Sequence, residues 1–269
     1  MTYSCEAQLE RDGTTLHYDV TGSGRPLVLL HAGIADRRMW DPQRSALCDQ
    51  YRVIRYDMRG FGNTRLSSGP FAHHRDLVAL LDELKAEQAT LVGASMGGAV
   101  ALNAALARPE RVEALVLVDA AIHGYNDWSE EFRAFGRAED DALDRGDLDA
   151  AVELNVRMWL DRPGRSPVSA EAVSLVRTMQ RRAFELQLAE PRAEEETLEP
   201  MADERLHEVN VPTLVVTGED DAPDFQKIAE RLAHAIPHTR TGVIQGAAHL
   251  PSLEQPDAFN RMLVDFLED

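Results

Sequence analysis

The stretch Ala89–Arg108 places a serine at a sharp turn between an apolar strand and a helix of small residues. Residues 90–92 form a short apolar run, which meets Gly93–Gly97 and continues without a break into the helix. Glycines two residues before and two residues after Ser95 form the pattern G-x-S-x-G, in which a tight turn leaves little room around the serine. The hydroxyl would then stand at the carboxyl end of a strand, over the positive end of the following helix. The sequence therefore predicts a nucleophilic serine, with the Met96 N–H pointing to the same place.

Strand-like and helical patterns alternate over most of the chain, which predicts an α/β fold. Continuous apolar runs indicate strands buried on both faces of a mostly parallel sheet, with helices on both sides. Residues 7–20 break at Asp12-Gly13 and predict a hairpin of two edge strands. The other expected strands are 26–30, 51–56, 90–92, 112–118, 211–217 and 239–244, and the expected helices between and after them include 73–86, 224–235 and 257–268.

Residues 121–205 interrupt this alternation. No strand-like run occurs there, and charge-rich helical segments are expected near 129–145, 147–160 and 169–190. The sequence therefore predicts a core domain from residues 1–120 and 206–269, and a helical insertion from residues 121–205.

Composition narrows the class of protein. A chain of 269 residues suits one α/β domain with an insertion, and its formal net charge of −18 argues against nucleic acid as a partner. No apolar run is long enough to cross a membrane, and the first residues lack a secretory pattern. Cys5 and Cys48 are too few for a disulfide framework, so both are expected to be thiols in the cytoplasm. The pair His73-His74 has no third ligand nearby, and no metal site is predicted.

A nucleophilic serine needs a base, and that base needs an acid to orient it. In an open α/β sheet, groups that follow parallel strands converge on one crevice. Of the five histidines after Ser95, His249 follows the strand near residue 243 and is the expected base. The others are placed less well: His123 opens the helical insertion, His207 and His238 precede strands, and His234 lies on a helix.

The expected acid lies in the loop after the strand 211–217. Of the carboxylates there, Asp224 fits the role of a helix cap, which leaves Asp220 and Asp221. Asp119, which ends an earlier strand, is an alternative to both. The residues alone do not choose among these three.

An oxyanion would need two N–H donors. Met96 supplies one, and the loop His31-Ala32-Gly33 after the strand 26–30 is placed to supply the other, because Ala32-Gly33 lets a backbone N–H approach closely.

Together these features resemble the α/β-hydrolase superfamily over nearly the whole chain outside residues 121–205. The order serine, acid, histidine is kept. The resemblance implies Asp221 as the acid, because the family's acid usually lies three residues past the glycine that ends its strand. It also implies Gly33 as the second oxyanion donor, with Ile34 as the alternative, since the family's usual His-Gly-x is His31-Ala32-Gly33 here. Residues 121–205 look like the family's helical cap.

Within the superfamily, the run from Gly246 to Asn260 resembles the branch of 3-oxoadipate enol-lactonases, related esterases and cofactor-free haloperoxidases. The resemblance implies hydrolysis of a carboxylic ester or lactone through an acyl-enzyme, with no cofactor. Perhydrolysis, haloperoxidation and carbon–carbon bond hydrolysis would use the same residues. A non-catalytic small-molecule receptor on the same scaffold is the alternative from another class. Trp40, Trp128 and Trp159 are the expected substrate contacts, and both a monomer and a homodimer stay open.

Overall fold

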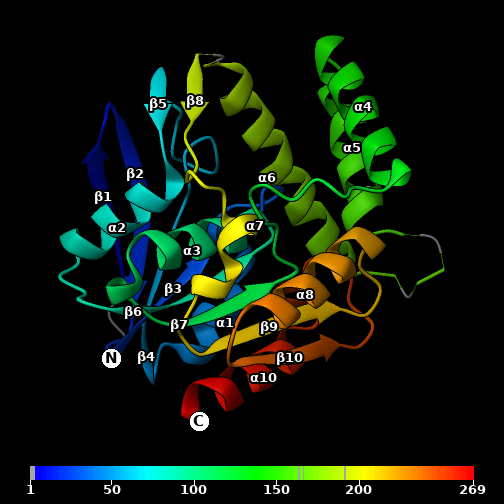
Figure 1. Cartoon of the computed structure of the whole chain (residues 1–269). Helices are drawn as coiled ribbons and strands as arrows, with labels where there is room; N and C mark the ends of the chain where they lie inside the picture. The colour runs from blue at the N-terminus through cyan, green and yellow to red at the C-terminus, as the bar shows by residue number, and fades with distance from the viewer. Residues whose placement is uncertain (1–3, 163, 166, 191) are drawn as a thin grey trace.

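The computed structural model describes residues 4–162, 164–165, 167–190 and 192–269. Within them, eight strands form one sheet in the order β1-β2-β4-β3-β6-β7-β9-β10. In Figure 1 this sheet runs from β1 at the left to β10 at the lower right. The strands are β1 Ser4–Arg11, β2 Thr14–Thr21, β3 Arg25–Leu30, β4 Tyr51–Tyr56, β6 Ala89–Ala94, β7 Val112–Val118, β9 Thr213–Gly218 and β10 Thr239–Ile244.

All neighbouring pairs from β4 to β10 are parallel, as the alternation of strands and helices predicted. β1 and β2 form the expected antiparallel hairpin, but only β1 lies at the edge of the sheet. β2 also pairs with β4, in the register Tyr18↔Tyr56 to Thr21↔Val53. The prediction of two edge strands was wrong for β2, because an alternating pattern reports one buried face and not which edges of a strand are paired.

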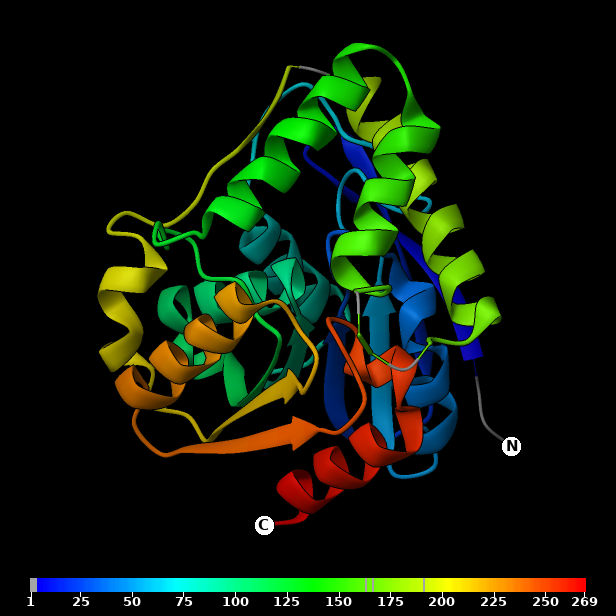
Figure 2. The same cartoon turned by 90° about the vertical axis from the view of Figure 1, so that its right-hand side faces the viewer.

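Helices cover both faces of the sheet (Figure 2). On one face lie α2 (His73–Glu83), α3 (Met96–Ala107) and α8 (Pro223–Ala235), and on the other lie α1 (Asp41–Leu47) and α10 (Pro256–Glu268). α3 is buried on nearly all sides because its small residues let it approach the sheet. A Cβ on Gly98 would lie 2.4 Å from the Ala120 Cβ, so that position excludes a side chain.

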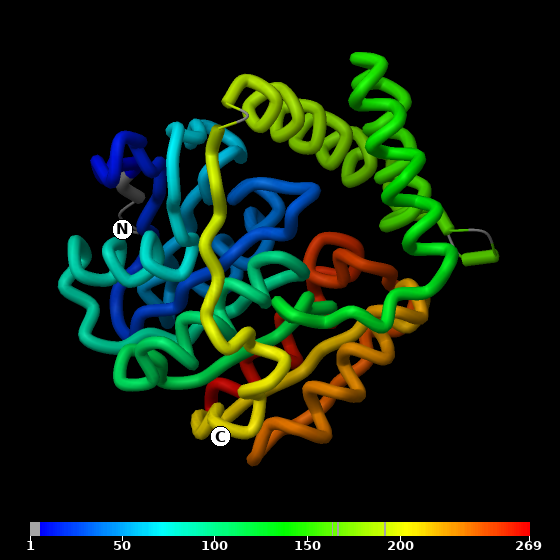
Figure 3. Tube along the Cα trace, turned by 45° about the horizontal axis from the view of Figure 1, so that its top comes forward, coloured from blue at the N-terminus to red at the C-terminus, as the bar shows by residue number. Residues whose placement is uncertain are grey.

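Three helices inside residues 121–205 form the cap: α4 (Glu130–Asp144), α5 (Leu148–Trp159) and α6 (Ala170–Leu188). In Figure 3 they arch over the core. The expected helical segments are present, but the region is not wholly helical. β8 (Ala193–Glu195) pairs in parallel with β5 (Gly69–Phe71) before α7 (Ala202–Arg205) returns the chain to the core. A three-residue strand with two glutamates has too little apolar pattern to be seen in the sequence.

Asp224 joins the cap to the core. The prediction that it caps α8 is wrong. The residue before α8 is Ala222, which makes no side-chain cap bond. The buried Asp224 carboxylate instead accepts hydrogen bonds from the Ser129 N–H and the Ser129 Oγ, both at 2.6 Å. Ser129 Oγ in turn accepts from the N–H of Phe132 at 3.1 Å and so caps α4. One carboxylate therefore fixes the point where the cap leaves the core.

Among the helices of the described residues, none is long and apolar enough to cross a membrane. Cys48 is a free thiol, and the side chain of Cys5 lies outside the described part of the chain.

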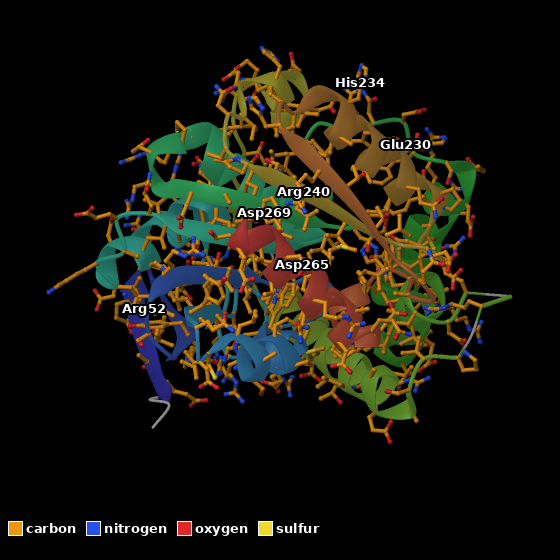
Figure 4. The ribbon with its side chains drawn as sticks, turned by 90° about the horizontal axis from the view of Figure 1, so that it is seen from below. Arg52, Glu230, His234, Arg240, Asp265 and Asp269 are labelled. Carbon is orange, nitrogen blue, oxygen red and sulfur yellow. The ribbon has the colours of Figure 1, made fainter. Side chains whose placement is uncertain are left out.

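We predict that Asp224→Ala lowers the free energy of unfolding by about 2 kcal/mol, because two donors of Ser129 lose a charged acceptor. Urea denaturation measures the change. Glu230→Ala is the matched control, since Glu230 is exposed on the same helix (Figure 4) and its loss should cost less than about 0.5 kcal/mol. Equal stability of the two variants would show that Asp224 does not hold the cap.

Candidate active site

Ser95 occupies a strained turn between β6 and α3. Its backbone has φ 50° and ψ −115°, in the left-handed half of the Ramachandran map that residues with a side chain rarely adopt. The turn is held on both sides by neighbouring strands. The N–H of Ser95 donates to the carbonyl of Val118 at 2.9 Å, and a Cβ on Gly97 would lie 2.4 Å from the Leu30 carbonyl oxygen. The fold thus presents a partly exposed serine at the carboxyl edge of the central strands.

His249 and Asp221 are in direct contact at the same edge. His249 follows β10 and Asp221 follows β9, and the imidazole Nδ1 lies 2.9 Å from the Asp221 Oδ2. The other carboxylate oxygen accepts from the N–H of Ala222 at 2.7 Å, which fixes its orientation. With Nδ1–H donating to the carboxylate, the imidazole Nε2 is left as the basic nitrogen.

Of the three candidate acids, Asp221 is the one in contact with the imidazole. Asp220 lies 3.7 Å from the guanidinium of Arg165. Asp119 lies behind Asp221, where its two carboxyl oxygens accept from the N–H of Gly218 at 3.2 and 3.1 Å. Burial, and then the negative charge of Asp221, raise the pKa of the Asp119 carboxyl well above its usual range. The raised pKa favours the protonated form of Asp119, which would donate its proton to Asp221.

The loop expected to supply the second oxyanion donor lies against the serine turn. A Cβ on Gly33 would lie 3.6 Å from both the Cβ and the Sδ of Met96, so the two segments adjoin. Met96 is the first residue of α3, where a helix N–H has no acceptor within the helix. The roles of Gly33 and Met96 as donors stay predictions.

The buried imidazole of His31 holds that loop in place. His31 Nδ1 donates to the carbonyl of Ala32 at 2.9 Å, and Nε2 accepts from the N–H of Met58 at 3.0 Å. Burial lowers the pKa of His31, so the ring stays neutral with one donor and one acceptor.

Aromatic rings enclose His249. The ring centroid of Trp159 lies 4.3 Å from that of His249 at an interplanar angle of 30°, and Phe225 meets the imidazole edge-on at 4.5 Å. Trp128 stacks on Phe132 at 4.1 Å and is partly exposed. Phe225 was missed by the sequence analysis, although its position in the first turn of the helix after the acid loop was a usable signal. The rings of Trp128, Phe132, Trp159 and Phe225 together form an aromatic wall beside His249. Two of the predicted substrate contacts, Trp128 and Trp159, thus lie in this wall.

Trp40 does not lie in this wall, which corrects its expected role as a substrate contact. Its side chain is 0% exposed and packs against Phe259 of α10, with ring centroids 6.0 Å apart. Trp40 follows the strand β3, as site residues do, but its ring turns into the layer between the sheet and α10.

The histidine pair at the start of α2 is buried. Burial lowers the pKa of His73 to about 3 and also lowers that of His74. Over the described residues, no group of three or more His, Cys, Asp or Glu side chains is arranged to hold a metal ion.

Comparison with known proteins gives matches to hydrolases over most of the chain. A family model described as "alpha/beta hydrolase fold" matches residues 25–256. A relative from Azorhizobium caulinodans, named putative carbamate hydrolase RutD, is 30% identical over 93% of this chain and 94% of its own length. Among solved structures, a thermophilic esterase from Thermogutta terrifontis has a TM-score of 0.77 at 28% identity, covering 98% of both chains. The enol-lactonase from Burkholderia xenovorans LB400 has a TM-score of 0.78 at 25% identity, covering 98% of this chain and all of that one.

The raised pKa of Asp119 predicts how its replacement changes stability with pH. The folded-state pKa of Asp119 is raised above its value of about 3.9 in an unfolded chain. Its contribution to stability is therefore fully present below about pH 4 and is lost as the pH rises toward the folded-state pKa. Asn keeps the same donor and acceptor without titrating. We predict that Asp119→Asn gains stability relative to the wild type as the pH rises above about 4, by at most about 1.4 kcal/mol per pH unit.

Thermal unfolding midpoints across this pH range measure the difference. Asp49→Asn removes the same formal charge from an exposed position and serves as the control. A stability difference that does not change with pH would show that Asp119 is ionised in the folded protein.

Proposed function

The chain belongs to the α/β-hydrolase family, and on that premise we propose that it cleaves carboxylic esters or lactones through Ser95, His249 and Asp221. The resemblance found in the sequence is confirmed, and so is the α/β fold with a mostly parallel sheet. Its relatives and structural neighbours include proteins named as a carbamate hydrolase, a carboxylesterase and an enol-lactonase.

The observation that carries the proposal is the buried contact of 2.9 Å between His249 Nδ1 and Asp221. A carboxylate in this position holds the imidazole in the tautomer whose Nε2 accepts a proton, and it stabilises the imidazolium that forms. The same sheet edge presents a strained serine, which has no base of its own on the turn. A base with a fixed tautomer at the same sheet edge as a partly exposed serine hydroxyl supports serine catalysis.

The proposed reaction has two halves. In the first, Ser95 Oγ attacks the carbonyl carbon while Nε2 of His249 takes the hydroxyl proton, and the N–H groups of Gly33 and Met96 stabilise the oxyanion. The tetrahedral intermediate then expels the alkoxide, which receives the proton from His249 and leaves an ester on Ser95. In the second, a water gives a proton to His249 and its oxygen attacks the acyl carbon. The acid is released as the proton returns to Ser95.

The aromatic wall supports an apolar substrate. Trp159 and Phe225 cover the imidazole, and Trp128 and Phe132 continue the apolar surface toward the start of α4. A wall of this kind excludes water from the imidazolium and strengthens its attraction to Asp221. We therefore expect esters and lactones with apolar acyl groups to react faster than anionic ones.

We predict that the wild type hydrolyses p-nitrophenyl esters of short fatty acids and that Ser95→Ala lowers kcat at least about 10³-fold, because the nucleophile is lost. A panel of esters, lactones and carbamates, followed by product release, measures the activity. A phosphonate should add its mass to the peptide that holds Ser95 and block turnover.

Equal rates in the wild type and Ser95→Ala would contradict the assignment of the nucleophile. Tight binding of a lactone without any turnover would favour a receptor on the hydrolase scaffold. Repeating the panel with hydrogen peroxide present separates perhydrolysis from hydrolysis, and a vinylogous diketone substrate tests carbon–carbon bond cleavage.

Replacement of the acid should separate Asp221 from its neighbour. We predict that Asp221→Asn lowers kcat about 10³- to 10⁴-fold. An amide that keeps its oxygen on the Ala222 N–H turns its NH2 toward His249 Nδ1, which selects the wrong tautomer, and a neutral amide does not stabilise the imidazolium. Asp119→Asn is the matched control: it removes one carboxyl from the same buried pair, but that carboxyl has a raised pKa and does not contact the imidazole. We expect it to keep kcat within about threefold. The reverse order in steady-state kinetics would make Asp119 the acid.

A further inference from the structure

The loop that carries His249, residues 246–250, is held by a carboxylate from the helix that follows it. Glu254 is the last residue of α9 (Pro251–Glu254), and its side chain is 1% exposed. Its carboxylate accepts from the N–H of Ala248 at 3.0 Å and from the N–H of Leu250 at 2.9 Å. These two residues flank His249, so Glu254 fixes the backbone on both sides of the imidazole.

The backbone N–H of His249 is hydrogen-bonded to the cap. His249 N–H donates to the carbonyl of Trp159 at 3.3 Å, and Trp159 is the last residue of α5. The indole of Trp159 is itself held, because its Nε1 donates to Asn155 at 3.0 Å on the same helix. The cap therefore contacts the histidine through both its backbone and its ring.

Arg165, in the segment between α5 and α6, completes this connection. Its side chain is 4% exposed, and its Nη2 donates to Glu254 at 2.6 Å and to the carbonyl of Gly246 at 3.1 Å. Its Nη1 donates to the carbonyl of Leu160 at 2.7 Å. One guanidinium thus joins the end of α5 to the first residue of the histidine loop and to the carboxylate that shapes it. Figure 2 shows the lower end of α5 lying close to α9.

The charges of this cluster depend on one another. A buried carboxylate is unfavourable unless it is paired, and removal of one partner leaves an uncompensated charge. Arg165 is the cation that Glu254 contacts, and its Nε also lies 3.7 Å from Asp220 in the acid loop. Undocking of Arg165 together with the end of α5 would remove that cation and the Trp159 carbonyl at the same time. The charged form of Glu254, which accepts from both flanking N–H groups, would then lose its support.

We propose that Arg165 and Glu254 are positioning residues, which make the placement of His249 depend on docking of the cap. The cap in this protein then does more than cover the site, because Trp159 and Arg165 supply part of the structure that holds the base. The effect on catalysis rests on the proposed function, whereas the effect on the histidine loop does not.

The experiment compares four variants of the full chain in two measurements. Amide hydrogen exchange at residues 248–250, followed by NMR, reports the histidine loop directly. The kcat per active site, with sites counted by phosphonate titration, reports the base. The variants are Arg165→Met, Arg165→Lys and Glu254→Gln, with Arg162→Met as the matched control. Arg162 belongs to the same segment, but its guanidinium pairs with Glu131 at 3.0 Å inside the cap.

Arg165→Met should speed exchange at residues 248–250 about tenfold or more, because the Glu254 carboxylate loses its cation. It should lower kcat per titrated site about 10- to 100-fold with KM changed less than about threefold, as expected for a base displaced by a fraction of an ångström to 1 Å. Glu254→Gln should have the same effects. Arg165→Lys should retain part of the protection from exchange and part of the kcat, since an ammonium can pair with Glu254 but cannot also reach Gly246 and Leu160. Arg162→Met should change neither.

Unchanged exchange in Arg165→Met overturns the proposal, and so does faster exchange with unchanged kcat per site. A role in stability alone would lower the number of titrated sites without changing the turnover of each. If Arg165→Met does not fold, Arg165→Lys decides by the same criteria. If the wild type turns over no substrate and takes up no phosphonate, the proposed function fails, and the exchange rates still decide whether the cap holds the loop.

Discussion

The hydrogen bond between Asp221 and His249 is the interaction on which the rest of the site depends. It joins the loops after β9 and β10, and it survives in the folded protein because aromatic rings keep water from the imidazole. A single hydrogen bond of this kind can orient the imidazole only if both partners are held rigidly, since a hydrogen bond between mobile side chains in water contributes little net free energy. Much of the surrounding structure serves to hold them.

Two carboxyl groups lie side by side beneath that bond, and their chemistry differs because their surroundings differ. The two oxygens of Asp221 contact the imidazole Nδ1 and the N–H of Ala222. Asp119 faces Asp221 and is fully buried, and both features raise its pKa. The Asp119 carboxyl accepts from the N–H of Gly218, which ties the end of β7 to the start of the acid loop. Sequence alone left these two residues as rivals, whereas the structure gives them complementary parts.

The cap is attached to the core at points that also touch the site. Asp224, which holds Ser129, is next to Phe225 in the wall around His249. Arg165 holds Glu254, whose carboxylate supports the histidine loop. A third attachment is the pairing of β8 with β5, which comes before the chain returns to the core. Two of these three attachments, at Asp224 and at Arg165, therefore lie next to residues that build the site.

The sequence by itself determined the features that arise from neighbours along the chain. The glycines around Ser95, the apolar runs of the central strands and the spacing of the cap helices all act through local backbone geometry, and the sequence analysis placed each of them. The order serine, acid, histidine along the chain then selected the fold family. What the sequence did not determine was the direction in which a side chain turns once the layers pack. Trp40 looked like a site residue because it follows β3, and packing turned its ring into the core.

Only the tertiary structure decided which charges meet. Asp224 and Ser129 are 95 residues apart in the chain, and Arg165 and Glu254 are 89 apart. Charged residues are common in both regions, and a local pattern cannot distinguish one that will be buried against a distant partner from one that stays in solvent. The free energy of such a pair depends on burial and distance, and both quantities exist only after the cap has folded onto the sheet.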